Sequence, residues 1–233
     1  KQTKYTPAEL NIAWNEFGTR YEYHEYKDTF KGGGKPVIQR LRDRNHSWDD
    51  DGIDTIIPSA LLQGLIGHPF ICPDMVGGGW WSLNYTPGFK IDQELFVRMA
   101  QVSALLPMMQ FSWAPWRVLD TYHAGLCLEA AMLHKKFAPY IIEQVKSSAV
   151  SGEPIVRHME YEYPHMGYER VLDQFMLGPD MLVAPVITKG QTERQVILPA
   201  GKWKYLGKTE YTGGSAVTVP APIDTLPYFE RVL

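Results

Sequence analysis

Residues 36–48, with the sequence PVIQRLRDRNHSW, join a short apolar segment to a run of charged and polar side chains. Residues 36–41 have the length and the branched apolar content of a buried strand, and Asp43 follows two residues later. Beyond the polar run, apolar side chains recur at helical spacing over residues 53–62, and glycines follow them. A strand that ends near acidic residues and continues into a helix is the unit from which parallel sheets are built.

The same unit recurs on both sides of this stretch. Towards the C-terminus, residues 68–73 form an expected strand that ends at Asp74 and three glycines. Towards the N-terminus, Thr-Pro-Ala-Glu at residues 6–9 is a capping box with proline at the first helical position. The other elements that the periodicity predicts are helices over residues 7–18, 92–106 and 121–145 and strands over residues 21–26 and 108–112. This order is that of consecutive units of a (β/α)₈ barrel.

The pattern changes at about residue 150. Short strand-like segments separated by Gly and Pro turns occupy residues 154–158, 181–186, 195–198, 203–205 and 216–219. Regularly spaced short strands are typical of a β-sandwich. We therefore expect two domains, with residues 1–149 belonging to a (β/α)₈ barrel and residues 150–233 forming a β-sandwich.

Composition excludes several classes of protein. With 45% hydrophobic residues the chain has the material for a core, and a net charge of −3 without a basic cluster argues against a nucleic-acid partner. An apolar run of membrane-spanning length is missing from the sequence, so we expect no membrane partner. Cys72 and Cys127 form neither a disulfide framework nor a zinc spacing, and we expect no metal site and no cofactor.

The candidate functional residues are those that follow the expected strands, because the active site of such barrels lies at the C-terminal strand ends. Asp43 and Asp74 follow two of these strands, and tryptophans are frequent nearby, at positions 48, 80, 81, 113 and 116. Aromatic rings pack on the apolar face of a pyranose, and glycoside hydrolysis needs two carboxyl groups. Position and residue type alone thus favour a carbohydrate enzyme.

Several motifs that occur in a fixed order make the prediction of a carbohydrate enzyme more specific. Asp43 precedes Trp48 by five residues, and the strand at 68–73 leads to Asp-Met-Val-Gly-Gly at residues 74–78. Later come DQFMLGPDMLVAPV at residues 173–186 and LPAGKW at residues 198–203. Together these motifs resemble glycoside hydrolase family 31 over nearly the whole chain. Residues 73–78 and 109–117 are most similar to the branch of the myogenesis-regulating glycosidase, which includes α-galactosidases.

This resemblance implies the C-terminal half of a TIM barrel followed by a β-domain, with retaining hydrolysis of a terminal α-linked galactoside or glucoside. It implies that Asp43 is the catalytic acid/base. The residues it implies for binding an oligosaccharide or glycoside are Asp74, Lys27, Arg40, Trp48, Trp80, Gln110 and Trp113. Lys27, Gln110 and Ser112 stand where many members have Arg, Arg and His, so glucose specificity does not follow.

The resemblance also places the nucleophilic aspartate on an earlier strand, before the helix at residues 7–18, and residues 1–6 hold no carboxylate. We therefore expect an N-terminal segment of the same enzyme to complete the barrel. Two alternatives stay open, a non-catalytic carbohydrate-binding or scaffold protein of the same fold and an α-transglycosylase. Among the acidic residues, the run Asp49, Asp50 and Asp51 is expected to be solvated at a helix N-terminus.

Overall fold

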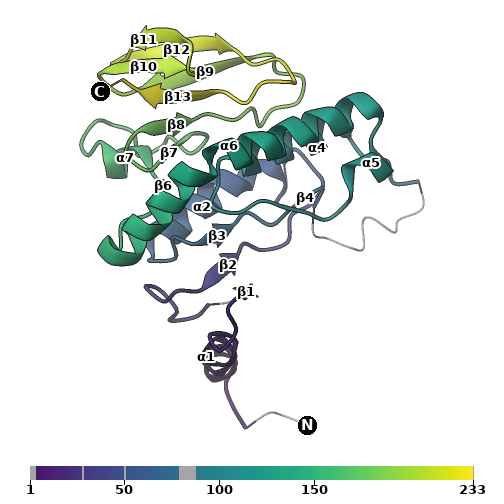
Figure 1. Ribbon diagram of the computed structural model, residues 1–233, viewed down its shortest axis with the longest axis vertical. Coiled ribbons are helices and arrows are strands. Elements are labelled where there is room, and N and C mark those ends of the chain that lie inside the picture. Colours follow the sequence, from purple (N-terminus) through teal and green to yellow (C-terminus); the bar gives the residue numbers. More distant parts are fainter. Residues whose placement is uncertain (1–3, 28, 50, 79–87, 233) are drawn as a thin grey trace.

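The computed structural model describes residues 4–27, 29–49, 51–78 and 88–232, and its first part alternates short strands with helices (Figure 1). The elements of this part are α1 (Pro7–Gly18), β1 (Glu25–Tyr26), β2 (Ile38–Arg40), η1 (Ile53–Thr55), α2 (Ile56–Leu65), β3 (Ile71–Cys72), β4 (Met75–Val76), α4 (Gln93–Ala104), β5 (Gln110–Phe111), α5 (Pro115–Val118) and α6 (Thr121–Ser151). The expected helices are all present. The helix expected at 121–145 extends to Ser151, and Gly152 caps it with a left-handed φ of 79°.

The strands of this part form two parallel sheets. In the first, β1, β2 and β3 pair in that order, and in the second β4 pairs with β5. β1, β2, β3 and β5 are shorter than the sequence predicted. Pro36, Pro69 and Pro107 lie at the starts of the expected strands, and proline has no N–H to donate to a ladder.

The single strand expected at residues 68–73 is instead two strands with different partners. β3 pairs with β2 and β4 pairs with β5, and Pro73 and Asp74 separate them. Asp74 has a φ of 80°, a left-handed conformation that turns the chain between the two sheets. The turn carries the Asp74 side chain into the protein interior, where it is shielded from solvent.

Helix α1 lies at the far end of the molecule from the β domain (Figure 1). Its predicted capping box is confirmed: the Thr6 side chain accepts from the Glu9 amide, and the Glu9 carboxylate accepts from the Thr6 amide. Tyr26 on β1 donates its hydroxyl to the Asn15 carbonyl at 3.1 Å. The same ring fills the space beside Gly18, where any Cβ would collide with it.

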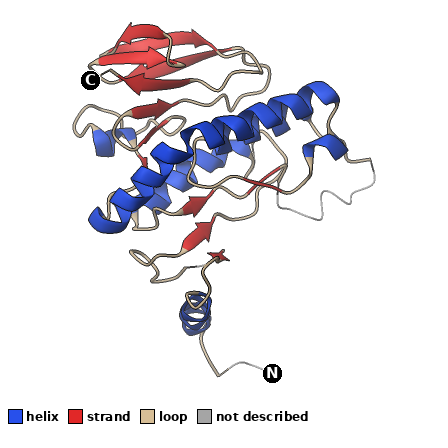
Figure 2. Cartoon of the chain, viewed as in Figure 1, coloured by secondary structure: helices blue, strands red, loops and turns tan. Residues whose placement is uncertain are grey.

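Residues beyond α6 form antiparallel sheets (Figure 2). The elements are β6 (Val156–Arg157), α7 (Met159–Glu162), β7 (Phe175–Leu177), β8 (Met181–Val183), β9 (Glu193–Leu198), β10 (Lys202–Tyr205), β11 (Thr209–Thr212), β12 (Ser215–Pro220) and β13 (Tyr228–Arg231). Six strands pair in the order β11-β10-β13-β8-β7-β6, and β12 pairs with β9. Apolar side chains of both sheets meet around the buried Trp203.

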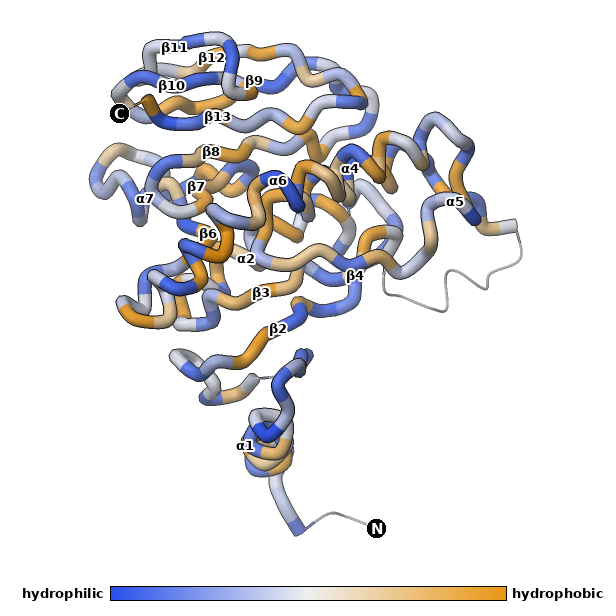
Figure 3. The backbone as a smooth tube through the Cα atoms, in the orientation of Figure 1, coloured by the Kyte–Doolittle hydropathy of each residue, from blue (hydrophilic) through white to orange (hydrophobic). Residues whose placement is uncertain are grey.

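A second and larger core joins the two parts of the chain. It contains apolar side chains of α2, α4 and α6 together with Val156, Phe175 and Tyr228 from the antiparallel sheet. Figure 3 shows hydrophobic residues along β7 and β8. Packing is thus continuous across residue 150, and the domain boundary there stays a prediction. No helix among the described residues has the length and apolar character needed to cross a membrane.

Arg98 on α4 fixes this helix to the antiparallel part. Its guanidinium is buried and donates to the carbonyl oxygens of Ala221 at 2.8 Å, Gln191 at 3.1 Å and Thr225 at 3.1 Å. Three hydrogen bonds from a charged donor make a firm connection, because such bonds are stronger than neutral ones. The start of α4, which borders the candidate site, is thereby held by loops of the β domain.

Candidate active site

The candidate site lies where the parallel strands end. Because β1, β2 and β3 run in one direction, their C-terminal ends share one edge, and the same holds for β4 and β5. Lys27 follows β1 directly, Asp43 follows β2, and Asp74 lies between β3 and β4. The fold therefore places Asp43 and Asp74, which the strand-end argument selected, at neighbouring strand ends, and Lys27, which the family resemblance implied, lies at the end of β1.

Asp43 and Lys27 are in side-chain contact. The Lys27 ammonium donates to Asp43 Oδ1, and the two side chains are 35% and 42% exposed for Asp43 and Lys27, respectively. An ammonium group can only donate, so the oxygen that faces it has to accept. A proton that Asp43 gives to a ligand must therefore leave from Oδ2. The exposed surface of Asp43 makes it accessible to a ligand in this arrangement.

Asp74, by contrast, is enclosed by protein. Its side chain is 0% exposed, and Oδ2 accepts from the Arg44 amide at 2.9 Å. Within the residues that the structure describes, Oδ1 has no hydrogen-bond donor. Burial raises the pKa of Asp74, against the opposing effect of amide hydrogen bonds and of Arg40, whose Nη1 lies 3.9 Å from Oδ1. A direct sugar contact would require this turn to open, so the binding role stays a prediction.

The glycines after β4 allow the turn to pack tightly. Gly77 and Gly78 have φ values of 97° and 91°, which L side chains rarely adopt. A Cβ on Gly77 would lie 2.7 Å from the Phe96 ring, and one on Gly78 would lie 2.9 Å from the Arg44 carbonyl oxygen. Because neither glycine has a Cβ, the loop after β4 can approach the Phe96 ring and the Arg44 backbone this closely. Burial lowers the pKa of Arg44 to about 10.

Glu25 on β1 contacts two of the predicted site residues and is a candidate that the sequence analysis did not find. Its Oε2 accepts from Gln110 Nε2 at 2.5 Å, and its Oε1 lies 3.2 Å from Arg40 Nε. The Arg40 contact lacks hydrogen-bond geometry, so it is an electrostatic contact. Glu25 thus joins two predicted sugar-binding residues from β2 and β5. An acidic residue within a strand, close to its C-terminal end, was the signal available in the sequence.

Trp48 is anchored to the start of α4. Its indole N–H donates to Asp92 Oδ2 at 3.1 Å, and Asp92 also caps α4 and accepts from Lys189 at 2.7 Å. The Asp92 amide donates to His46 Nε2 at 3.0 Å, which places the imidazole proton on Nδ1. Burial lowers the pKa of His46, in keeping with a neutral ring. Trp48 and His46 are therefore connected to the helix whose position Arg98 fixes.

The other predicted aromatic residues differ in environment. Trp113 is half-buried, packs on the core and lies beside Gly77. Trp116 is 77% exposed on α5. Trp80 and Trp81 lie outside the described residues, so the predicted sugar contact of Trp80 stays a prediction. Among the described residues, no group of three or more His, Cys, Asp or Glu side chains is arranged to hold a metal ion.

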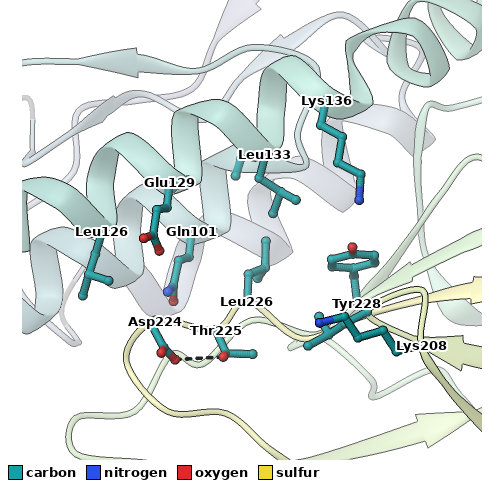
Figure 4. Close-up of a pocket in the computed structure, with 13 residues that line it drawn as sticks. Gln101, Leu126, Glu129, Leu133, Lys136, Lys208, Asp224, Thr225, Leu226 and Tyr228 are labelled. Atoms are coloured by element: carbon teal, nitrogen blue, oxygen red, sulfur yellow. Dashed lines mark hydrogen bonds between the residues drawn. The ribbon is translucent and has the colours of Figure 1, made fainter.

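A separate pocket lies between α4, α6 and the antiparallel sheet (Figure 4). It has a volume of about 340 Å³, an apolar floor that includes Leu133 and Leu226, and a rim with Glu129 and Lys136. None of the predicted site residues that the structure describes lines it. The pocket is therefore distinct from the candidate site at the strand ends.

Parallel strand–helix units followed by antiparallel sheets place this chain among α/β proteins with a C-terminal β domain. Residues 152–232 match the family model described as the glycosyl hydrolase family 31 C-terminal domain. The chain belongs to glycoside hydrolase family 31. Members of this family combine a TIM barrel with a β domain, and this chain corresponds to the C-terminal part of that fold.

Individual relatives agree with this assignment. Over 203 residues the chain is 36% identical to the mouse myogenesis-regulating glycosidase, covering 82% of this chain and 28% of that protein. It is 32% identical to the sulfoquinovosidase of Escherichia coli K12, covering 95% and 35%. A sulfoquinovosidase from E. rectale, solved with an aza-sugar inhibitor, superposes with a TM-score of 0.74 at 25% identity, covering 84% and 30%. The chain spans about a third or less of the length of these relatives.

Proposed function

We propose that this chain supplies the general acid/base and part of the sugar-binding surface of a retaining α-glycosidase that acts on a terminal α-linked hexose. The observation that carries the proposal is the position of Asp43. It follows a parallel strand of a family 31 chain, it is partly exposed, and it has a cationic neighbour in Lys27. The name of the mouse relative, a glycosidase, supports the same activity.

In the proposed reaction Asp43 gives its proton to the glycosidic oxygen while a second carboxylate attacks the anomeric carbon. The leaving group departs as an alcohol, and the sugar is held as a glycosyl ester on the second carboxylate. Asp43, now ionised, takes a proton from water as that water attacks the anomeric carbon and releases the carboxylate. The resemblance assigns the second carboxylate to an aspartate on an earlier barrel strand.

The proposed sugar-binding set contains exposed and enclosed members. Lys27, Gln110 and Trp113 have surface that can meet a ligand, whereas Asp74 acts in the present arrangement by holding the Arg44 amide. Arg40 lies between the carboxylates of Glu25 and Asp74. Galactose and glucose differ in the orientation of one hydroxyl, so polar side chains of this kind set the preference between an α-galactoside and an α-glucoside.

We also propose that residues 1–149 are completed by further barrel units and that residues 150–233 form a β-sandwich. Among the described residues, β1, β3, β4 and β5 each have one edge without a strand partner, and a sheet edge in a closed barrel needs a partner. An apolar groove of about 730 Å³ lies beside β5, lined by Phe111, Trp116 and Leu128 among others. We expect the additional strand–helix units of a closed barrel to cover this groove.

Turnover by the complete polypeptide tests the proposed function. Nitrophenyl α-galactopyranoside and α-glucopyranoside are offered, and proton NMR identifies the anomer that is released first. The α-anomer is expected, because two displacements retain configuration. First release of the β-anomer would contradict the mechanism, and absence of turnover together with hexose binding would favour the scaffold alternative. Products enlarged by one sugar at high acceptor concentration would instead indicate a transglycosylase.

A further inference from the structure

We propose that Glu25 is a positioning residue of the sugar site, one that orients Gln110 and Arg40 and thereby sets the preference between epimeric hexoses. This inference rests on the proposed function. Glu25 has one carboxylate oxygen on each partner, Oε2 at 2.5 Å from Gln110 Nε2 and Oε1 at 3.2 Å from Arg40 Nε.

The contact between Glu25 and Gln110 crosses between two sheets. Glu25 belongs to the sheet β1-β2-β3 and Gln110 to the sheet β4-β5, and 85 residues separate them in sequence. No backbone pairing in the described part of the chain connects β1 to β5, so Glu25 and Gln110 meet through their side chains and not through a shared strand ladder. A change in one of them acts on the other without breaking a strand ladder.

The chemistry of the pair dictates which way the Gln110 amide faces. An ionised carboxylate has acceptor sites only, whereas the amide has donors on Nε2 and an acceptor on Oε1. Gln110 therefore has to turn its NH₂ group towards Glu25, and its carbonyl oxygen faces elsewhere. A sugar hydroxyl that meets this oxygen must donate a hydrogen bond. Glu25 consequently decides whether Gln110 offers a sugar an acceptor or a donor.

Glu25 also competes with Asp74 for the Arg40 guanidinium. The guanidinium lies 3.2 Å from Glu25 and 3.9 Å from Asp74, with the Arg40 and Glu25 side chains only 19% and 24% exposed. At this burial the charges are screened less than at the surface, so removing one carboxylate redirects the cation towards the other. Loss of the Glu25 charge would move Arg40 towards the enclosed Asp74.

The test replaces Glu25 by Gln in the complete polypeptide and measures kcat/KM for nitrophenyl α-galactoside and α-glucoside. We expect the ratio of the two values to change at least about tenfold, the effect of one hydrogen bond to a charged group. Glu25→Gln and Gln110→Ala should be non-additive, so that the double variant loses no more than the more damaging single one. Glu22→Gln, the same substitution at an exposed residue nearby, should leave the ratio unchanged.

The epimer ratio separates positioning from a general loss of structure, because partial unfolding lowers both kcat/KM values equally. An unchanged ratio in Glu25→Gln, with an active parent protein, overturns the inference and leaves the proposed function intact. Additive losses for Glu25→Gln and Gln110→Ala also overturn it, since they show that the two residues act separately. A parent protein that neither cleaves nor binds α-hexosides removes both the inference and the proposed function.

Discussion

Lys27 and Asp43, sixteen residues apart in sequence, meet side chain to side chain at the ends of two adjacent parallel strands. One residue is the proposed acid/base, and the other is a donor that occupies one of its oxygens. Both are partly exposed, so neither is needed to fill the core. The pair can therefore be altered with little effect on folding, which makes it suitable for separating activity from stability.

Replacing Lys27 by Met should affect activity more than stability. Exposed ion pairs contribute about 0–1 kcal/mol, so the free energy of unfolding should change by less than about 1 kcal/mol. The value of kcat/KM for an α-hexoside should fall about tenfold, because Asp43 loses its partner and the sugar loses a donor. Urea unfolding and steady-state kinetics check both values. Lys35→Met, at an exposed position, is the control, and equal losses in the two variants would refute a specific role for Lys27.

Replacing Asp43 by Asn should produce losses that depend on the leaving group. A nitrophenolate departs without protonation, whereas a sugar alcohol needs a proton, so kcat/KM should fall about 10²–10⁴-fold more for a disaccharide than for the nitrophenyl glycoside. Azide, which needs no general base, should restore turnover of the nitrophenyl substrate and yield a glycosyl azide. Asp49→Asn, at an exposed residue of the same loop, should behave like the parent. Equal losses on both substrates would make Asp43 structural.

Asp74→Asn should change how stability depends on pH. Because burial raises the pKa of Asp74 above its ordinary value of 3.8, the folded protein binds this proton more tightly than the unfolded chain does. The resulting stabilisation is complete below about pH 3.8 and is lost as pH rises through the folded pKa. An Asn side chain does not ionise, so the variant has no such loss of stability. Its free energy of unfolding should therefore increase relative to that of the parent between pH 4 and pH 7. Denaturant titrations across this range measure the difference, and a constant difference would contradict the effect.

Replacing Trp48 by Phe tests whether the Trp48 indole stabilises the start of α4 or contacts the sugar. Phe keeps an aromatic face but cannot donate to Asp92, so we expect about 1 kcal/mol lower stability with KM nearly unchanged. Differential scanning calorimetry and KM for the nitrophenyl substrate give the two readings. A raised KM with unaltered stability would show that the indole N–H serves the ligand and not the start of α4.

The helices were the most predictable part of the fold. Capping residues such as Thr6 and Glu9, and apolar side chains at helical spacing, identify helix positions from local sequence alone. Strand lengths depend on the partners that the ladder provides, and the split at Pro73 follows from β3 and β4 pairing with different strands. Local patterns do not contain that information.

The site was predictable to the extent that strand ends and motifs define it. They selected Asp43, Lys27 and Asp74, which the fold places at neighbouring strand ends. They did not reveal that Asp74 would be enclosed, because its burial results from the turn between two sheets. Glu25 was missed since alternation over residues 21–26 does not show which face of the strand is inside, and its partner Gln110 is remote in sequence.

The buried Arg98 affects how this protein can be recombined with its relatives. Its guanidinium joins α4 to the loops around Gln191, Ala221 and Thr225. Asp92, which caps the N-terminus of the same helix, accepts a hydrogen bond from Trp48. A chimera that exchanges the β domain at residue 150 would separate Arg98 from the carbonyl oxygens that match it. A chimera should therefore fold only when α4 and the β domain come from the same parent protein.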